Sequence, residues 1–307
     1  MRFEIVYYTG TGSTALVAKR FQEALLNAGN SGGIRVLSMA KNLTLPDPRR
    51  LPPHDLLVLL FPIYSFNAPG AVLRWLENIP SANNIPAAVV SVSGGGDCRP
   101  NDAGRIGPIK LLESKGYDIV YDGMFVMPSN FMTATGDLVA AKLLEVLPLK
   151  ASQAVDLVVS GKKHRTSPPL IDRFFTKAGA LEKFAAKTFG KNIAISEHCN
   201  GCGWCATHCP AGNISVEPLA GGGSEADIPG KYSKPVFGRE CHLCLSCIYG
   251  CPRKALSPRV FKFIVVKEGY DLKRWESMLP LKEPVDIDGL AKGVMWSGVR
   301  KYLSGQR

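Results

Sequence analysis

Two cysteine runs of identical spacing constrain this 307-residue chain more than any other feature. Each run reads C-x2-C-x2-C-x3-C-P. The first comprises Cys199, Cys202, Cys205 and Cys209, and the second comprises Cys241, Cys244, Cys247 and Cys251. Three thiolates spaced in this way can wrap one tight loop around an iron–sulfur cubane. The fourth cysteine is followed by a proline that starts a segment leading away, so it reaches the other cluster.

Zinc and disulfide bonds are the alternative uses of these cysteines. Structural zinc usually takes two separated CxxC pairs, whereas each run places all four cysteines close together. Disulfides are disfavoured in a reducing cytoplasm. We expect a cytoplasmic location because Met1–Val6 is strand-like, carries an acid and contains no apolar signal region. Thiolate ligands at this spacing favour two [4Fe–4S] clusters.

The cysteine runs closely resemble those of bacterial two-cluster ferredoxins over roughly residues 191–257. The resemblance implies crossed ligation. Cys199, Cys202 and Cys205 would share one cluster with Cys251, and Cys241, Cys244 and Cys247 would share the other with Cys209. The long connection from Asn213 to Arg239, which contains the glycine-rich Ala220–Ser224, departs from a minimal ferredoxin.

Strand-like apolar runs alternate with amphipathic stretches in the first 150 residues. The expected helices are one with an apolar stripe at Val17, Phe21, Leu25 and Ala28, and others at 69–79, 103–116 and 137–147. The expected strands are Phe3–Tyr8, Ile34–Leu37, Asp55–Phe61, Ala87–Ser93 and Ile119–Val126. This alternation predicts an α/β fold with a five-stranded, parallel, doubly wound sheet of the flavodoxin-like type.

A loop rich in glycine and hydroxyl groups directly follows the first strand. This phosphate loop consists of Thr9, Gly10, Thr11, Gly12, Ser13 and Thr14. Its small residues let backbone N–H groups form an anion nest at the start of a helix. The loop contains no lysine, which argues against a nucleoside triphosphatase, and Ala15 makes a poor dinucleotide fingerprint. On composition alone, a tight turn capped by Ser13 also explains it.

The phosphate loop resembles that of flavodoxins, with Ser13 where many members have Asn. The resemblance implies that its hydroxyls and amides bind the phosphate of FMN. Two further loops follow strands at the edge where open α/β sheets bind ligands, and in flavodoxins they hold the isoalloxazine ring. They contain Pro62, Tyr64, Ser65, Phe66 and Asn67 after the third strand, and Ser93, Gly94, Gly95 and Gly96 after the fourth.

Several residues near these loops have simpler explanations. Tyr64 or Phe66 can stack on a flavin, but an aromatic at a strand end also serves as rim packing. Cys98 lies beside the glycines, and a free thiol in a reducing cytosol accounts for it. Met127–Phe131 follows the fifth strand and is expected at the same edge.

The chain divides into four predicted parts: residues 1–150, 151–190, 191–260 and 261–307. They are a flavodoxin-like domain, a basic helical linker, a small α+β ferredoxin-like domain and a C-terminal extension. The extension contains a strand-like run, Phe261–Val266, and a helix candidate at 288–303. No apolar run approaches the roughly 20 residues of a membrane span.

The formal charge of +11 is concentrated in the linker. Residues 161–190 hold 7 Lys and Arg against 2 Asp and Glu, including Lys162, Lys163, Arg165 and Lys187. A solvated helix face is the default explanation. A docking surface for an acidic redox partner is the sharper alternative, since charge steers transient encounters. No groove-reading motif accompanies the basic residues, so nucleic acid is not an expected partner.

The order of the motifs resembles the flavodoxin–ferredoxin fusion proteins of anaerobic bacteria and archaea, over about residues 1–260. The resemblance implies electron transfer between FMN, two [4Fe–4S] clusters and external partners. Those partners would be an acidic protein of ferredoxin or flavodoxin type, or a larger redox complex. The alternative is an FMN-dependent reductase that delivers cluster electrons to a bound organic substrate. The sequence offers no clear acid or base for that chemistry, so no catalytic residue is assigned.

Overall fold

The first half of the chain forms a five-stranded parallel sheet with the strand order β2-β1-β3-β4-β5. A computed structural model describes residues 1–307 apart from 31, 40–50, 97–99, 167–181, 218–232 and 306–307. The strands are β1 (Phe3–Tyr7), β2 (Ile34–Ser38), β3 (Leu56–Pro62), β4 (Ile85–Ser93) and β5 (Tyr117–Val126). This order is that of flavodoxin-like doubly wound sheets, which confirms the predicted fold class.

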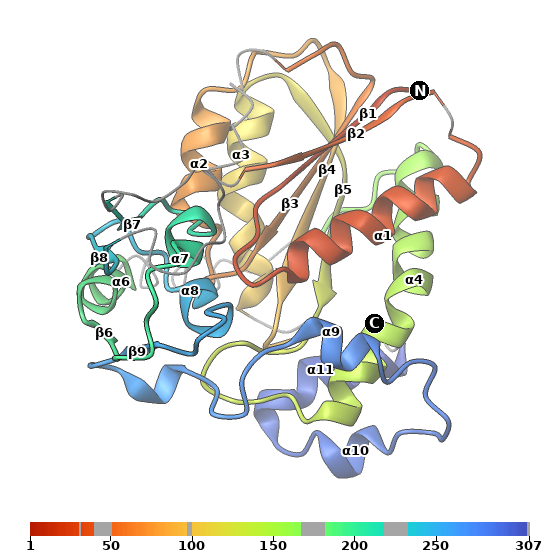
Figure 1. The fold of residues 1–307 in the computed structure, drawn as a ribbon. Helices are drawn as coiled ribbons and strands as arrows, with labels where there is room; N and C mark the ends of the chain where they lie inside the picture. The colour runs from red at the N-terminus through yellow and green to blue at the C-terminus, as the bar shows by residue number, and fades with distance from the viewer. Residues whose placement is uncertain (31, 40–50, 97–99, 167–181, 218–232, 306–307) are drawn as a thin grey trace.

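Helices cover both faces of the sheet (Figure 1). Successive strand residues point to opposite faces, so Ile5 and Val58 lie in one apolar core while Val6 and Leu59 lie in the other. The first core is covered by α1 (Ser13–Asn27) and α4 (Asp137–Val159). The second is covered by α2 (Gly70–Glu77) and α3 (Ile106–Ser114), which follows the short 3-10 helix η2 (Asn101–Arg105).

Helix α4 is much longer than the predicted 137–147 and runs past the predicted domain boundary at 150. The predicted end at 147 directly precedes Pro148, and a proline lacks an N–H group and disfavours a helix interior. The helix continues through Pro148 because Ala151, Ala154 and Val158 remain buried against the sheet. Tertiary burial therefore outweighs the lost hydrogen bond.

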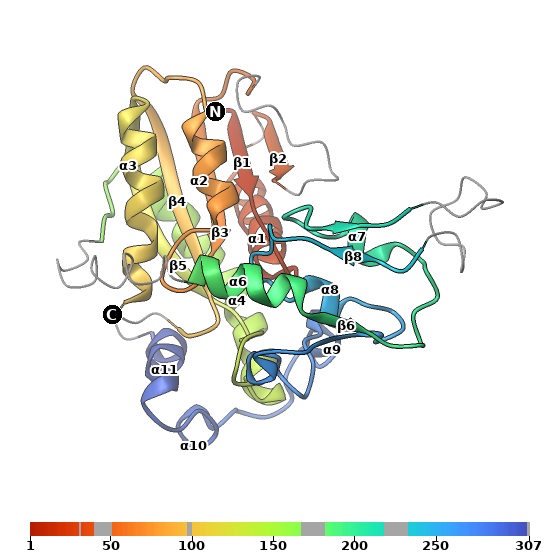
Figure 2. The ribbon, with the colours of Figure 1, turned by 90° about the vertical axis from the view of Figure 1, so that its left-hand side faces the viewer.

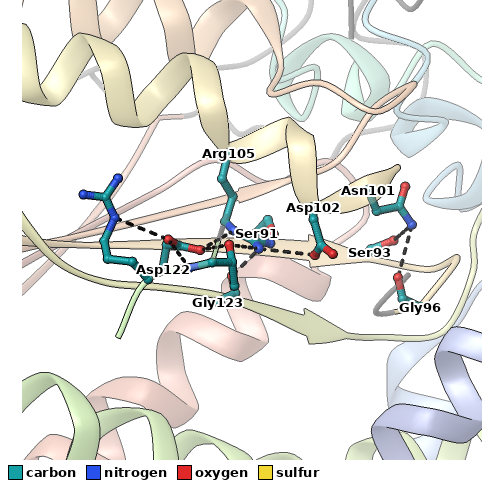
Figure 3. Close-up of polar contacts among 10 residues, drawn as sticks. Ser91, Ser93, Gly96, Asn101, Asp102, Arg105, Asp122 and Gly123 are labelled. Atoms are coloured by element: carbon teal, nitrogen blue, oxygen red, sulfur yellow. Dashed lines mark hydrogen bonds and ion pairs between the residues drawn. The ribbon is translucent and has the colours of Figure 1, made fainter. Parts of the chain in front are cut away.

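A buried ionic network ties β5 to η2 (Figure 3). The Arg105 side chain, 2% exposed, donates from Nε to Asp122 Oδ1 at 3.1 Å, and Asp122 is fully buried. Arg105 also donates to Ser91 Oγ at 2.8 Å and to Asp102 at 3.2 Å. The backbone N–H of Thr166 donates to the other Asp122 oxygen at 2.9 Å. The carboxylate and the guanidinium are thus both paired inside the domain.

Residues 163–165 of the predicted basic linker lie along the edge of the sheet. His164 forms a parallel bridge with Tyr121 on β5. On either side of His164, Lys163 pairs with Asp118 at 2.6 Å and Arg165 pairs with Glu113 at 3.0 Å. Two of the basic residues that suggested partner docking therefore contact acids of the sheet domain. Residues 167–181 of the predicted linker lie outside the described residues.

The cysteine-rich half is a small α+β unit, as predicted (Figure 2). Its two sheets each have two antiparallel strands, β6 (Ile193–Ile195) with β9 (Leu256–Pro258) and β7 (Ile214–Ser215) with β8 (Val236–Phe237). The short helices α7 (Trp204–Thr207) and α8 (Ser246–Tyr249) follow the cysteine loops, and α6 (Glu182–Lys191) precedes β6. The predicted insertion Ala220–Ser224 lies outside the part of the chain that the structure describes.

The C-terminal segment differs from both sequence expectations. Phe261–Val266 is not a strand but contains the 3-10 helix η4 (Lys262–Ile264), because Phe261 has a left-handed φ of 53°. The predicted helix at 288–303 is divided into α10 (Ile287–Leu290), η5 (Val294–Trp296) and α11 (Ser297–Ser304). Gly293, with a φ of 87°, separates α10 from η5. No described helix is long and apolar enough to cross a membrane.

The buried ionic network predicts a large loss of stability in Asp122→Ala. Removing the carboxylate leaves Arg105 buried without its main charge partner, which costs about 3–5 kcal/mol. Asp118→Ala is the matched control, because its partner Lys163 is 61% exposed and such pairs contribute about 0–1 kcal/mol. Guanidinium unfolding followed by circular dichroism measures both variants. Equal free energies of unfolding in the two variants would contradict this role for Asp122.

Candidate redox site

The eight cysteines line two cavities in the ferredoxin-like half. The first cavity is lined by Cys199, Cys202, Cys205 and Cys251. The second cavity is lined by Cys209, Cys241, Cys244 and Cys247. All eight are free thiols. The structure therefore brings together the same two groups of four that the resemblance to ferredoxins implies for crossed ligation.

The two cysteine loops have the same backbone shape despite different residues. In the first loop, Gly201 and Gly203 have left-handed φ angles of 67° and 75°. The corresponding residues of the second loop are Leu243 and Leu245, with φ angles of 54° and 61°. A left-handed conformation costs roughly 1–2 kcal/mol for a residue with a side chain. Both leucines are buried in the apolar core around the cysteines, which offsets that cost.

The sulfur atoms that line the two cavities are suited to bind a positively charged metal core. The pKa of Cys205 and of Cys244 is raised to about 12. Burial is the larger cause, and the charges of neighbouring cysteines add to it. Metal ligation requires thiolates, so four thiolates in one cavity need positive charge between them. Backbone N–H groups already donate to sulfur, from Asn213 to Cys209 at 3.2 Å and from Ala255 to Cys251 at 3.3 Å. The donor set fits iron–sulfur clusters.

The second cavity lies directly against the carboxyl edge of the parallel sheet. A β-carbon added to Gly10 would lie only 2.6 Å from Cys244 Cβ, so this contact requires glycine. Beside it, the Tyr8 hydroxyl hydrogen-bonds with His242 Nδ1 at 2.7 Å. Burial, aided by the charge of Arg74, lowers the pKa of His242 to about 4, so the imidazole is neutral at neutral pH. The cluster half is thus docked on the end of β1.

The phosphate loop connects β1 to α1 with the features of an anion nest. Gly12 has a left-handed φ of 98°, which glycine adopts readily. Helix α1 begins at Ser13 without a side-chain cap and without an acid in its first turn. One N–H is already committed, because Gly12 donates to Thr9 Oγ1 at 3.2 Å. The Thr14 side chain is buried beneath the loop. The remaining donor groups suit a phosphate.

Residues from distant parts of the chain contact the phosphate loop. Asn130, from the segment after β5, donates from Nδ2 to Thr11 Oγ1 at 3.0 Å. The Tyr270 hydroxyl hydrogen-bonds with Ser13 Oγ. A β-carbon on Gly12 would lie 3.3 Å from the side chain of Leu272, which begins α9 (Leu272–Glu276). The sequence placed Asn130 near this edge, but no local signal indicated Tyr270, which lies 257 residues from Ser13.

The loop after β3 is a tight turn close to the phosphate loop. Tyr64 and Asn67 exchange two backbone hydrogen bonds of 2.9 Å, while Ser65 and Phe66 have left-handed φ angles of 40° and 64°. Such conformations are strained for residues with side chains and often occur at functional sites. The Tyr64 hydroxyl lies 2.7 Å from the position of a β-carbon on Gly10. Tyr64 therefore belongs to the same edge as the phosphate loop, and Pro62 ends β3 before the turn.

The glycines after β4 approach the chain's own backbone closely. A β-carbon on Gly94 would lie 2.7 Å from Ser129 Cα, and one on Gly96 would lie 2.5 Å from the backbone of Val299. The Asn101 amide holds this loop by donating to Ser93 Oγ and to Gly96 O at 3.1 Å each (Figure 3). The close packing of Gly94 and Gly96 positions this loop at the carboxyl edge of the sheet. Gly95 is exposed there, and Cys98 lies outside the described residues.

Comparison with known proteins gives a family match in the cysteine-rich half and structural matches to flavodoxins. Residues 191–252 match the family of 4Fe-4S dicluster domains. Among solved structures, oxidised flavodoxin 2 from Bacillus cereus is 16% identical, with a TM-score of 0.40, covering 52% of this chain and 99% of that one. Two-electron reduced flavodoxin from Megasphaera elsdenii is 20% identical, with a TM-score of 0.34, covering 50% and 99%. No protein of curated function matches the chain.

The chain therefore joins a flavodoxin-like sheet, identified by its strand order, to a 4Fe-4S dicluster domain. This confirms the combination that the order of motifs suggested. The two halves contact each other where Cys244 packs on Gly10.

Gly10→Ala tests the contact between the two halves. The added methyl group must displace Cys244 or Tyr64, and overpacking of this kind costs about 1–3 kcal/mol. The backbone of Gly10 is not left-handed, so the loss would come from packing alone. Gly136→Ala is the control, since a β-carbon there meets nothing within 4 Å. Chemical unfolding of the cluster-loaded protein measures both, and an unchanged Gly10→Ala would argue against the docked arrangement.

Proposed function

We propose that this chain is an electron-transfer iron–sulfur flavoprotein, in which FMN at the sheet edge exchanges electrons with two [4Fe–4S] clusters. The observation that carries this proposal is the contact of Cys244 with Gly10, where a predicted cluster ligand packs on the predicted phosphate loop. The two predicted cofactor sites thus adjoin each other. A flavin can transfer one or two electrons at a time, whereas an iron–sulfur cluster transfers one. A flavin next to clusters therefore converts between two-electron and one-electron transfer.

In this proposal, one cluster is held by each group of four cysteines. The first cavity takes Cys199, Cys202, Cys205 and Cys251, and the second takes Cys209, Cys241, Cys244 and Cys247. Both groups draw one cysteine from the other run, as expected for crossed ligation. The free thiols and the N–H groups directed at sulfur support thiolate ligation in both cavities.

The proposed FMN site uses residues of three loops at the carboxyl edge. Thr9–Thr14 would hold the phosphate with hydroxyls and amides, and the α1 dipole would favour its negative charge. The turn at Tyr64 and the loop at Ser93–Gly96 would flank the ring. Support comes from the open N-terminus of α1 and from the position of Tyr64 beside Gly10.

The arrangement gives an order to the electron carriers. The second cavity adjoins the sheet, whereas the first cavity is farther along the ferredoxin-like half, and three of its four cysteines are only partly buried. We therefore place the second cluster between the flavin and the first cluster. Electrons would enter or leave through the first cluster or directly at the flavin edge.

An acidic redox protein is the partner class that we propose, and α6 is its best-supported contact. Phe189 of α6 lines the second cavity, and Lys187 and Lys191 on the same helix are exposed. Lys163 and Arg165 suit this role less, because they already pair with Asp118 and Glu113. Positive charge near a cluster would favour encounter with a negatively charged carrier.

Cofactor content and cysteine variants test this function. Anaerobic preparation should give about eight irons per chain and one releasable FMN. Crossed ligation predicts that Cys209→Ser and Cys241→Ser lose the same cluster signal in electron paramagnetic resonance, while Cys202→Ser and Cys251→Ser lose the other. Loss of the same signal in Cys209→Ser and Cys202→Ser would contradict the crossed ligation. Full iron content without any flavin would contradict the flavoprotein proposal.

A further inference from the structure

Tyr270 places a buried hydroxyl at the phosphate loop from the other end of the chain. The residue is 8% exposed, and its hydroxyl hydrogen-bonds with Ser13 Oγ and contacts the Thr11 side chain. Two aromatic rings pack against the Tyr270 ring. The ring centroid of Trp275 lies 5.1 Å away in an edge-on contact, and that of Tyr249 lies 6.0 Å away. The phenol thus contacts two hydroxyl-bearing side chains of the phosphate loop and lies beside the proposed anion nest.

The segment that carries Tyr270 is also held by contacts outside the phosphate loop. Asp271 caps α9 by accepting from the N–H groups of Lys273 and Arg274. Trp275, which contacts Tyr270, donates from Nε1 to Asp137 at the start of α4 at 2.8 Å. The segment is thus anchored to the sheet domain, so the position of Tyr270 does not depend on its contact with Ser13.

We propose that Tyr270 completes the phosphate subsite by donating its hydroxyl hydrogen bond to the phosphate of FMN. This inference rests on the FMN site proposed above. It also assigns a role to the C-terminal segment, which closes the phosphate loop and contributes a cofactor-binding residue.

The composition of the loop explains why such a donor is useful. Thr9–Thr14 contains no lysine or arginine to neutralise a phosphate. One of its amides is already used, since Gly12 donates to Thr9. Hydrogen bonds to charged groups are stronger than those between neutral groups, so each added donor matters at an anion. Burial also raises the pKa of Tyr270 above its usual value, so the phenol remains protonated and able to donate.

A second buried tyrosine, far from the phosphate loop, provides the control. In Tyr270→Phe, only the hydroxyl at the loop is lost. Tyr117 is 5% exposed, stacks on His54 and is the first residue of β5, so Tyr117→Phe removes a hydroxyl at the opposite edge of the sheet. Both variants keep the rings, and cluster spectra of the full-length chain check that the fold is retained.

The measurement is the dissociation constant of FMN and of riboflavin for flavin-depleted, cluster-loaded protein, followed by quenching of flavin fluorescence. Tyr270→Phe should weaken FMN binding about tenfold or more, since it removes a hydrogen bond to a charged group. Riboflavin has no phosphate, so its affinity should stay unchanged. Tyr117→Phe should bind FMN like the unaltered protein.

Two results would overturn the inference without touching the proposed function. Unchanged FMN affinity in Tyr270→Phe, while Thr11→Glu abolishes binding, would show that the loop binds phosphate without Tyr270. Tighter FMN binding in Tyr270→Phe would show that the tyrosine occupies the subsite and competes with the phosphate. Failure of the unaltered protein to bind FMN would instead contradict the proposed flavin site itself.

Discussion

The packing of Cys244 on Gly10 is the contact on which the arrangement of this protein depends. Because Gly10 has no side chain, the second cysteine loop reaches the carboxyl end of β1 and joins the phosphate loop. The hydrogen bond between Tyr8 and His242 and the one between Asn130 and Thr11 lie around this contact. Together they bring a predicted cluster site and a predicted flavin site to one edge of the sheet.

Local patterns in the sequence were sufficient to predict the elements of the sheet. All five expected strands are present. The runs of β1, β3, β4 and β5 are apolar and mostly buried, as in a sheet covered on both faces, whereas β2 lies at the edge of the sheet and is only partly buried. The errors occurred where distant contacts decide the structure. Helix α4 passes through Pro148 because Ala151 and Val158 are buried. Phe261–Val266 contains the 3-10 helix η4 rather than a strand, and Val265 forms an isolated bridge with Phe131.

In the candidate site too, residues that are brought together by distant contacts could not be predicted from the sequence. The resemblance of the cysteine runs to those of two-cluster ferredoxins implied the same two groups of cysteines that line the cavities. Tyr270 and Leu272 had no such signal, because their contacts with the phosphate loop arise only when the C-terminal segment folds back. Nor does a count of charges reveal that Lys163 and Arg165 pair with acids about 50 residues away.

Paramagnetic NMR offers the most direct test of the claim that the second cavity adjoins the phosphate loop. A paramagnetic cluster at Cys244 should broaden the backbone amide signals of Gly10 and Thr11, because relaxation rises steeply as an amide approaches the iron. Gly116, at the opposite end of the sheet beside Ala82, should keep a sharp signal in the same sample. Broadening confined to the ferredoxin-like half, with Gly10 as sharp as Gly116, would contradict the account.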